Sequence, residues 1–275
     1  MPAYTEPAAW ALPGLETSSG CFETMRVYAG TIFRLPAHLE RLYASAQSLG
    51  VRLSDSPAQL SRRLNAAVRR SGLAEAVIRV AMIPSAGGRM PARVAFPSIV
   101  VQPVPLPPAV LYRRGLRVAI VPTKRFPITQ INPQAKFSAR QGSVMAVMDA
   151  QLRQVDEAIF LDERGYVTES TASNLGLIKD GRFIAPPCWM GLLPGITWLA
   201  VEELAPRVGL RVEERPVTRH ELYNADEVLL TSTIKEVIPV TQVDGRRIGT
   251  GRPGALTARL RRAFRELVRR ELRGR

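Results

Sequence analysis

Lysine is scarce in this chain. Of its 38 Lys and Arg residues only four are lysines, namely Lys124, Lys136, Lys179 and Lys235. A lysine amine held in its neutral form is a nucleophile that can form a Schiff base with a carbonyl compound. Lys136 stands in NPQAKFSARQG, at the end of a polar loop before an expected helix. Of the others, Lys179 lies in an expected hairpin turn (KDGR), Lys124 in a basic loop and Lys235 at the start of an expected strand. Position alone therefore favours Lys136 only modestly.

Motifs for other chemistries are absent or incomplete. IGTGRPG (248–254) contains G-x-G-x-x-G, but only 21 residues follow it, too few to complete a dinucleotide-binding βαβ unit, so we interpret it as a turn. No G-x-S-x-G elbow, P-loop or H-E-x-x-H occurs. Two cysteines, Cys21 and Cys188, and two histidines, His38 and His220, cannot supply a recognisable zinc cluster. We therefore expect no metal, and we expect both thiols to be free.

The net charge of +14 raises the question of nucleic-acid binding. The arginines are spread along the whole chain, and the densest run, 259–275, also carries apolar residues at helical spacing (Leu260, Phe264, Leu267, Val268 and Leu272). This pattern predicts a core-docking amphipathic helix with a solvated basic face, and leaves nucleic-acid binding as a minor alternative. No run of 18 apolar residues and no secretory signal is found, which predicts a cytoplasmic enzyme without a membrane segment.

The elements that must position these residues alternate between strands and helices. In the first half we expect strands at 21–28, 77–83 and 94–102 and helices at 36–50 and about 57–71. The proline-rich segment 103–110 is the best domain boundary. In the second half we expect a strand at 116–121, helices at 138–153 and 196–207, and several short strands. The pattern predicts an α/β (α+β) protein with a small N-terminal domain, 1–108, and a larger domain, 109–275, that carries Lys136.

Six blocks of the sequence, in order from about Gly20 to Thr257, resemble one enzyme family. They are GCFETMRVYAG, HLERLYASA, DEAIFLDERGYVTESTASNL, LLPGIT, ADEVLLTST and IPVTQVDGRRIGTGRPGALT. Each is weak alone, but together they are similar to the class IV aminotransferases, which are two-lobed fold-type IV pyridoxal-phosphate enzymes. The resemblance implies pyridoxal 5'-phosphate as cofactor, an amino-acid-like small molecule as substrate, and a homodimer.

The resemblance also assigns a role to individual residues. Lys136 would hold the cofactor as a Schiff base and act as catalytic base and acid. Glu169, in VTES, matches the carboxylate that keeps the pyridine nitrogen protonated, which makes the ring a better electron sink. Arg41 and Thr233 match phosphate ligands, and the backbone N–H groups of Ile196 and Thr197 would face the phosphate at a helix start. Taken singly, Arg41 and Glu169 could equally be members of surface ion pairs.

The reaction is less clearly indicated than the family. Gln141 stands where branched-chain aminotransferases carry a tyrosine, and the Arg-x-His pair of D-amino-acid aminotransferases is missing. GCF and Gly87-Gly88-Arg89 resemble 4-amino-4-deoxychorismate lyase of the folate pathway, although Ile83-Pro84-Ser85 departs from its pattern. We therefore narrowly favour that lyase, with an aminotransferase acting on branched-chain or D-amino acids as the alternative. The candidate substrate-binding residues are Phe22, Arg79 and Arg89.

Overall fold

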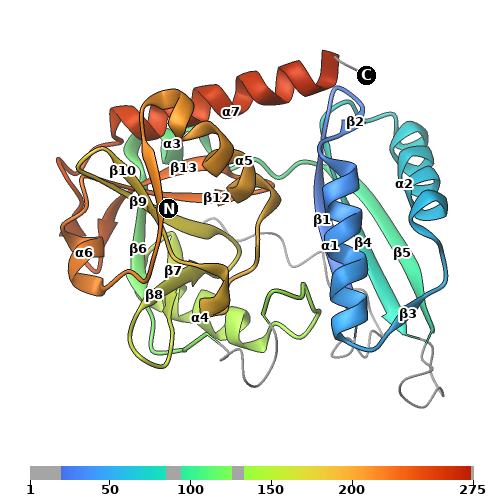
Figure 1. The fold of residues 1–275 in the computed structure, drawn as a ribbon, viewed down its shortest axis with the longest axis horizontal. Helices are drawn as coiled ribbons and strands as arrows, with labels where there is room; N and C mark the ends of the chain where they lie inside the picture. Colours follow the sequence, from blue (N-terminus) through green and yellow to red (C-terminus); the bar gives the residue numbers. More distant parts are fainter. Residues whose placement is uncertain (1–19, 85–93, 126–132, 274–275) are drawn as a thin grey trace. The chain divides into compact units, whose positions relative to one another are not determined.

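The protein is described by a computed structural model that covers residues 20–84, 94–125 and 133–273. These residues divide into two compact units (Figure 1). The first unit comprises 20–84, 94–105, 134–140 and 268–273, and the second comprises 106–125, 133 and 141–267. Each unit has its own sheet and its own hydrophobic core. This mixture of strands and helices agrees with the α/β (α+β) class expected from the sequence.

The first unit is a five-stranded sheet with two helices on one face. The strand order is β2-β1-β4-β5-β3, with β1 Cys21–Tyr28, β2 Thr31–Ile32, β3 Arg52–Leu53, β4 Ala76–Pro84 and β5 Val94–Pro103. Helices α1 (Leu35–Ser48) and α2 (Pro57–Ser71) share one core with the sheet (Figure 1). Helix α2 begins with a capping box, in which Ser56 and Gln59 satisfy each other's backbone N–H groups.

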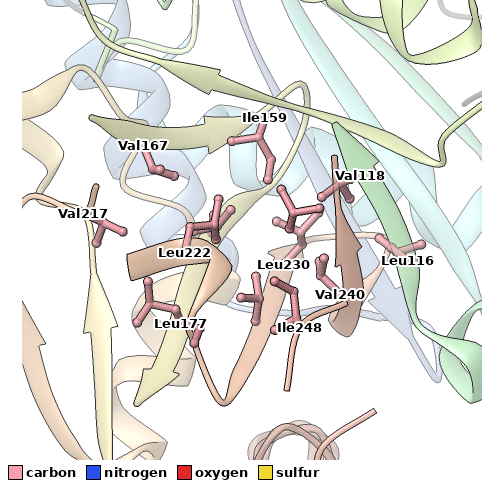
Figure 2. Close-up of a cluster of buried hydrophobic side chains, with 14 of the residues drawn as sticks. Leu116, Val118, Ile159, Val167, Leu177, Val217, Leu222, Leu230, Val240 and Ile248 are labelled. Carbon is pink, nitrogen blue, oxygen red and sulfur yellow. The ribbon is translucent and has the colours of Figure 1, made fainter. Parts of the chain in front are cut away.

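The second unit is built on a nine-stranded sheet that closes on itself. The strand order is β11-β10-β9-β12-β13-β6-β7-β8; β8 also pairs with β9, and β14 pairs with β13. The strands are β6 Leu116–Ile120, β7 Glu157–Leu161, β8 Val167–Ser170, β9 Asn174–Lys179, β10 Arg182–Ala185, β11 Arg211–Glu214, β12 Glu227–Ser232, β13 Glu236–Val243 and β14 Arg246–Arg247. Apolar side chains such as Val118, Ile159 and Leu230 fill the core (Figure 2).

Helices and short helical turns complete the second unit, and residues 268–273 of the last helix belong to the first unit. They are α3 Ala109–Arg114, α4 Gln141–Leu152, η3 Cys188–Met190, α5 Ile196–Leu204, η4 Pro206–Val208, α6 Arg219–Tyr223 and α7 Ala255–Arg273. On α7 the predicted apolar residues Leu260, Phe264, Leu267 and Val268 are buried, whereas Leu272 is half-buried. Residues 249–252 form a turn and a bend, and 253–254 have no regular structure, as expected for the glycine-rich segment before this helix.

Two element boundaries differ from the sequence prediction for physical reasons. The helix expected at 138–153 begins only at Gln141, because Phe137 bridges to Cys21 and the Ser138 N–H donates to the Gly20 carbonyl at 2.8 Å. These pairings hold the segment extended beside β1. The same contacts place 134–140, with Lys136, in the first unit, whereas the sequence placed Lys136 in the domain 109–275. Helix α5 ends at Leu204, two residues before Pro206.

Several general properties follow from the described residues. Cys21 and Cys188 are free thiols. Within 20–84, 94–125 and 133–273, no group of three or more His, Cys, Asp or Glu side chains is arranged to hold a metal ion. None of the helices in these ranges combines the length and apolar composition that crossing a bilayer requires.

Candidate active site

The backbone of Lys136 is fixed at both of its polar groups. Its N–H donates to the Oγ of Ser45 at 2.9 Å, and its carbonyl accepts from the Phe22 N–H at 3.0 Å. Its side chain is half-buried, and the Nζ atom lies 5.1 Å from the centre of the Phe22 ring. This distance is within the range of a cation–π contact. The first unit therefore holds Lys136 at a defined place beside β1.

Phe22 is surrounded by further positive charge in the first unit. Arg79, on β4, places its guanidinium carbon 4.3 Å from the ring centre, and that of Arg140 lies 5.8 Å away. Phe22 pairs with Ala81 across β1 and β4, so Arg79 is its diagonal neighbour on the same sheet face. The structure thus brings together Phe22, Arg79 and Lys136, all of which the sequence proposed, and adds Arg140. Arg89 lies outside the described residues.

Arg41 is bound on the opposite face of β1, the face that packs on the helices. Its Nε and an Nη donate to the two carboxylate oxygens of Glu23, at 2.7 and 2.9 Å. His38, one turn earlier on α1, contacts the same carboxylate through Nδ1 at 2.8 Å. Burial by itself raises the pKa of Glu23, but the Arg41 charge and the His38 hydrogen bond outweigh it and hold the pKa well below its usual range. Glu23 is therefore an ionised carboxylate inside the unit.

In the second unit, Glu169 on β8 is buried and held from three directions. Arg125 lies 2.6 Å from its Oε1, while the Leu193 N–H and the Asn174 Nδ2 donate to its Oε2 at 3.3 and 3.5 Å. Asn174 also donates to the Leu193 carbonyl at 2.7 Å. These bonds connect Glu169 to the loop that leads into α5.

The start of α5 has the properties of an anion site. Gly195 is its N-cap residue and gives no side-chain cap, and Ile196 and Thr197 follow as its first residues. The N–H groups of a first helical turn have no acceptors within the helix and carry partial positive charge. An added Cβ at Gly195 would overlap the Oδ1 of Asn174, so a larger residue there would require Asn174 to move. Thr233 lies in the turn after β12, two residues beyond Thr231, which pairs with Asn174 on β9.

The other three lysines are engaged elsewhere or exposed. Lys179 pairs with Asp226 at 2.8 Å near the surface, which raises the pKa of its amine. Lys235, which the sequence placed at the start of a strand, lies in a turn and is buried against Glu157 at 2.6 Å. Glu157 also accepts from the Thr171 hydroxyl. Lys124 is exposed in a loop. Lys179 and Lys235 are therefore each committed to a carboxylate of the second unit, whereas the Lys136 amine lies over an aromatic ring.

The described residues suit pyridoxal phosphate, the cofactor implied by the sequence. The Ser173 and Thr231 hydroxyls are buried and have no hydrogen-bond partner among the described residues. They flank Asn174, beside the helix start whose N–H groups attract anions. The first unit carries a lysine amine and a guanidinium, and the second unit carries these donors; groups of these kinds suit an aldehyde that carries a phosphate. Glu169 is a carboxylate able to face a ring nitrogen.

Sequence reasoning missed Glu23, His38, Ser45, Asn174 and Arg125. A signal existed for the first two. Glu23 interrupts the apolar residues of β1 on its buried side, and His38 stands three positions before Arg41, on the same helix face. Ser45, Asn174 and Arg125 gave no comparable signal, because their roles depend on contacts with distant segments.

Known proteins resemble this chain over nearly its whole length. Residues 20–243 match the family described as amino-transferase class IV. A putative branched-chain-amino-acid aminotransferase of Methanocaldococcus jannaschii is 35% identical, covering 92% of this chain and 88% of the relative. The D-alanine aminotransferase of Bacillus licheniformis is 34% identical, covering 93% and 89%.

The fold agrees with this relationship. The crystal structure of a T.th. branched-chain amino acid aminotransferase with pyridoxamine 5'-phosphate superposes with a TM-score of 0.88 at 31% identity, covering 96% of this chain and 91% of that one. The fold class, the enzymatic nature and the pyridoxal-phosphate cofactor predicted from the sequence are confirmed. The chain therefore belongs to the class IV aminotransferase family.

Proposed function

We propose that this protein is an aminotransferase that moves an amino group from an amino acid to a 2-oxo acid. The observation that carries the proposal is Lys136, whose backbone is fixed at both polar groups and whose amine lies over Phe22. The relatives reported above are named aminotransferases, and none of them is named a lyase. The 4-amino-4-deoxychorismate lyase narrowly favoured from the sequence thus becomes the second candidate.

The residues of this chain divide the work by their chemistry. Pyridoxal phosphate supplies an aldehyde and a ring that withdraws electrons from the substrate α-carbon. The Lys136 amine would hold the aldehyde and would take the proton from that carbon. Glu169 holds a proton at the ring nitrogen, and Arg125 keeps its carboxylate in place. Arg41, the Ile196 and Thr197 backbone N–H groups, and Thr233 bind the phosphate.

For the substrate, we propose branched-chain amino acids first and D-amino acids second. The ring of Phe22 offers an apolar surface to an aliphatic side chain, and Arg79 and Arg140 offer guanidinium groups to a carboxylate. Arg79 is followed at the second position by Ala81, so the Arg-x-His pair expected of D-amino-acid enzymes has no histidine here. This absence sets the order of the two candidates. Arg89 keeps its proposed role in binding the substrate.

We also propose that the enzyme is a homodimer that uses helix α4. Its buried side packs Ala146 and Ala150 on Phe160. Its other side exposes four large apolar side chains, with relative exposures of 59, 58, 57 and 84%: Val144, Met145, Met148 and Leu152. A contiguous exposed apolar stripe marks an interaction surface, and in a two-fold dimer the same stripe from a second copy can cover it. A cytoplasmic location stays a prediction of the sequence.

The reaction is tested by asking whether product formation needs an amino acceptor. The purified enzyme with pyridoxal phosphate is incubated with L-leucine, L-isoleucine, L-valine, D-alanine or 4-amino-4-deoxychorismate, with and without a 2-oxo acid. We expect sustained 2-oxo acid formation from an aliphatic amino acid only when the acceptor is present. Pyruvate and 4-aminobenzoate released without acceptor, and no transfer from the amino acids, would establish the lyase instead.

The assignment of the lysine is tested separately. Borohydride treatment of the enzyme with its cofactor, followed by peptide mass spectrometry, should place the label on the peptide containing Lys136. The Lys136→Ala variant should take up no label and lose activity by at least about 10²-fold, as expected for loss of an acid–base group. A label on Lys124, Lys179 or Lys235 would contradict the assignment.

A further inference from the structure

We infer that Glu23 is a positioning residue that fixes the guanidinium of Arg41 and thereby gives the enzyme its preference for a phosphorylated cofactor. The inference rests on the proposed phosphate-binding role of Arg41. It goes further by assigning the selectivity for phosphate to a carboxylate that itself touches neither cofactor nor substrate. Both residues belong to the first unit, on neighbouring elements β1 and α1.

The geometry of the pair is that of a clamp. Glu23 is fully buried, and its two oxygens accept from two different nitrogens of Arg41, at 2.7 and 2.9 Å. A two-point contact between planar groups sets both the position and the plane of the guanidinium. Since the Arg41 side chain is only 9% exposed, this contact is shielded from water and from salt. Because the guanidinium is planar and rigid, fixing two of its nitrogens also fixes the directions in which its other N–H bonds point.

His38 holds the other partner of the clamp. Its Nδ1 contacts the Glu23 Oε2 at 2.8 Å, and the histidine is itself buried. Burial lowers the pKa of His38, the charges of Arg41 and Lys136 lower it further, and Glu23 opposes them. A neutral His38 donating its Nδ1 hydrogen fits these surroundings. The carboxylate is therefore held by two residues from the same face of α1, and it cannot turn without breaking one of these contacts.

Fixing an arginine in advance changes how it recognises an anion. A free arginine side chain has many rotamers, and ordering it on binding reduces affinity. Glu23 removes this loss, because the guanidinium is already ordered before the phosphate arrives. The effect concerns the phosphate alone, since the aldehyde is bound by Lys136. A ligand that lacks the phosphate should accordingly be insensitive to Glu23.

Pyridoxal, which has the aldehyde and the ring but no phosphate, provides the discriminating probe. Equilibrium dissociation constants of pyridoxal phosphate and pyridoxal are measured for the full-length apoenzyme and for Glu23→Gln. We expect the ratio of the pyridoxal dissociation constant to the pyridoxal phosphate dissociation constant to fall by about tenfold or more, with pyridoxal affinity changed by less than about twofold, as when one charge-assisted contact is lost. An equal weakening of both ligands, or an unchanged ratio, would overturn the inference.

Two further variants separate the possible failures. Arg41→Gln should lower the same ratio at least as much; an unchanged ratio there would remove Arg41 from the phosphate site and the inference with it. Glu75→Gln is the matched control. Glu75 pairs at 2.7 Å with Arg26, which lies on β1 like Glu23, and its substitution should leave the ratio unaltered. Should Glu23→Gln fail to fold, Glu23→Asp keeps the charge and shortens the reach. A lowered ratio in that variant supports the clamp, and a wild-type ratio overturns it.

Discussion

The backbone N–H of Lys136 donates a hydrogen bond of 2.9 Å to the hydroxyl of Ser45, a residue 91 positions earlier in the chain. The Ser45 hydroxyl in turn donates to the carbonyl of Arg41, one helical turn before it, at 2.7 Å. One buried serine thus joins the loop of the proposed cofactor lysine to the helix of the proposed phosphate arginine. This link fixes the backbone of Lys136 relative to helix α1, while Glu23 fixes the guanidinium of Arg41.

Replacing Ser45 by alanine should loosen this connection. The Lys136 N–H would lose its acceptor in a partly buried place, so we expect the free energy of unfolding to fall by about 1–3 kcal/mol. Attachment of the cofactor, followed by borohydride trapping at Lys136, should also slow. Ser48→Ala is the control, because the exposed Ser48 makes the same type of bond to Ala44 on the same helix but does not contact Lys136. Equal effects of the two substitutions would contradict the proposed link.

Gly195→Ala should disturb the start of helix α5. The new Cβ would overlap the Asn174 Oδ1, so Asn174 must move away from Leu193 and Glu169. We expect a loss of stability of about 1–3 kcal/mol, typical of overpacking, and weaker binding of pyridoxal phosphate. Calorimetry and cofactor titration measure both. Combining it with Asn174→Ala should cost less than the sum of the single changes, since the clash is relieved; simple additivity would argue against a clash.

Met148→Glu should dissociate the proposed dimer. A charge in the centre of the exposed apolar stripe of α4 would be buried without a partner in the assembly. Light scattering should show a dimer for the unaltered protein and a monomer for this variant. Gln151→Glu adds the same charge at an exposed polar position of α4 and should leave the dimer intact. A monomeric unaltered protein, or a dimeric Met148→Glu variant, would remove α4 from the interface.

Glu202 should make the stability of the protein depend on pH. Burial, and to a lesser degree the nearby Glu214 carboxylate, raise its pKa from 4.5 to about 7. Between these values the folded protein binds more protons at Glu202 than the unfolded chain does, so the contribution of Glu202 to stability is fully present below about 4.5 and is lost as the pH rises towards 7. In Glu202→Gln this loss disappears, and its Tm should decline less than that of the unaltered protein over this window. The exposed Glu163→Gln should keep the original decline; a decline unchanged in Glu202→Gln would refute the assignment.

Local patterns in the sequence predicted much of the fold because they act over a few residues. The periodic apolar residues of α1 depend on neighbours within one or two turns. The capping residue of α2 is of the same kind. The boundary of α4 was placed too early, because Phe137 and Ser138 are held extended by Cys21 and Gly20, more than 100 positions away.

The sequence by itself determined the family, through six blocks in order from about Gly20 to Thr257, and the types of group available for the chemistry. Only the tertiary structure decided how those groups are held. Lys235 and Lys136 are both lysines near polar residues in the sequence, but Lys235 is occupied by Glu157, 78 positions away. Glu23, His38 and Ser45 acquire their roles in the same way. A buried charge or N–H group needs a partner, and the folded chain can supply it from a distant segment. Such a pairing does not produce a periodic pattern in the sequence.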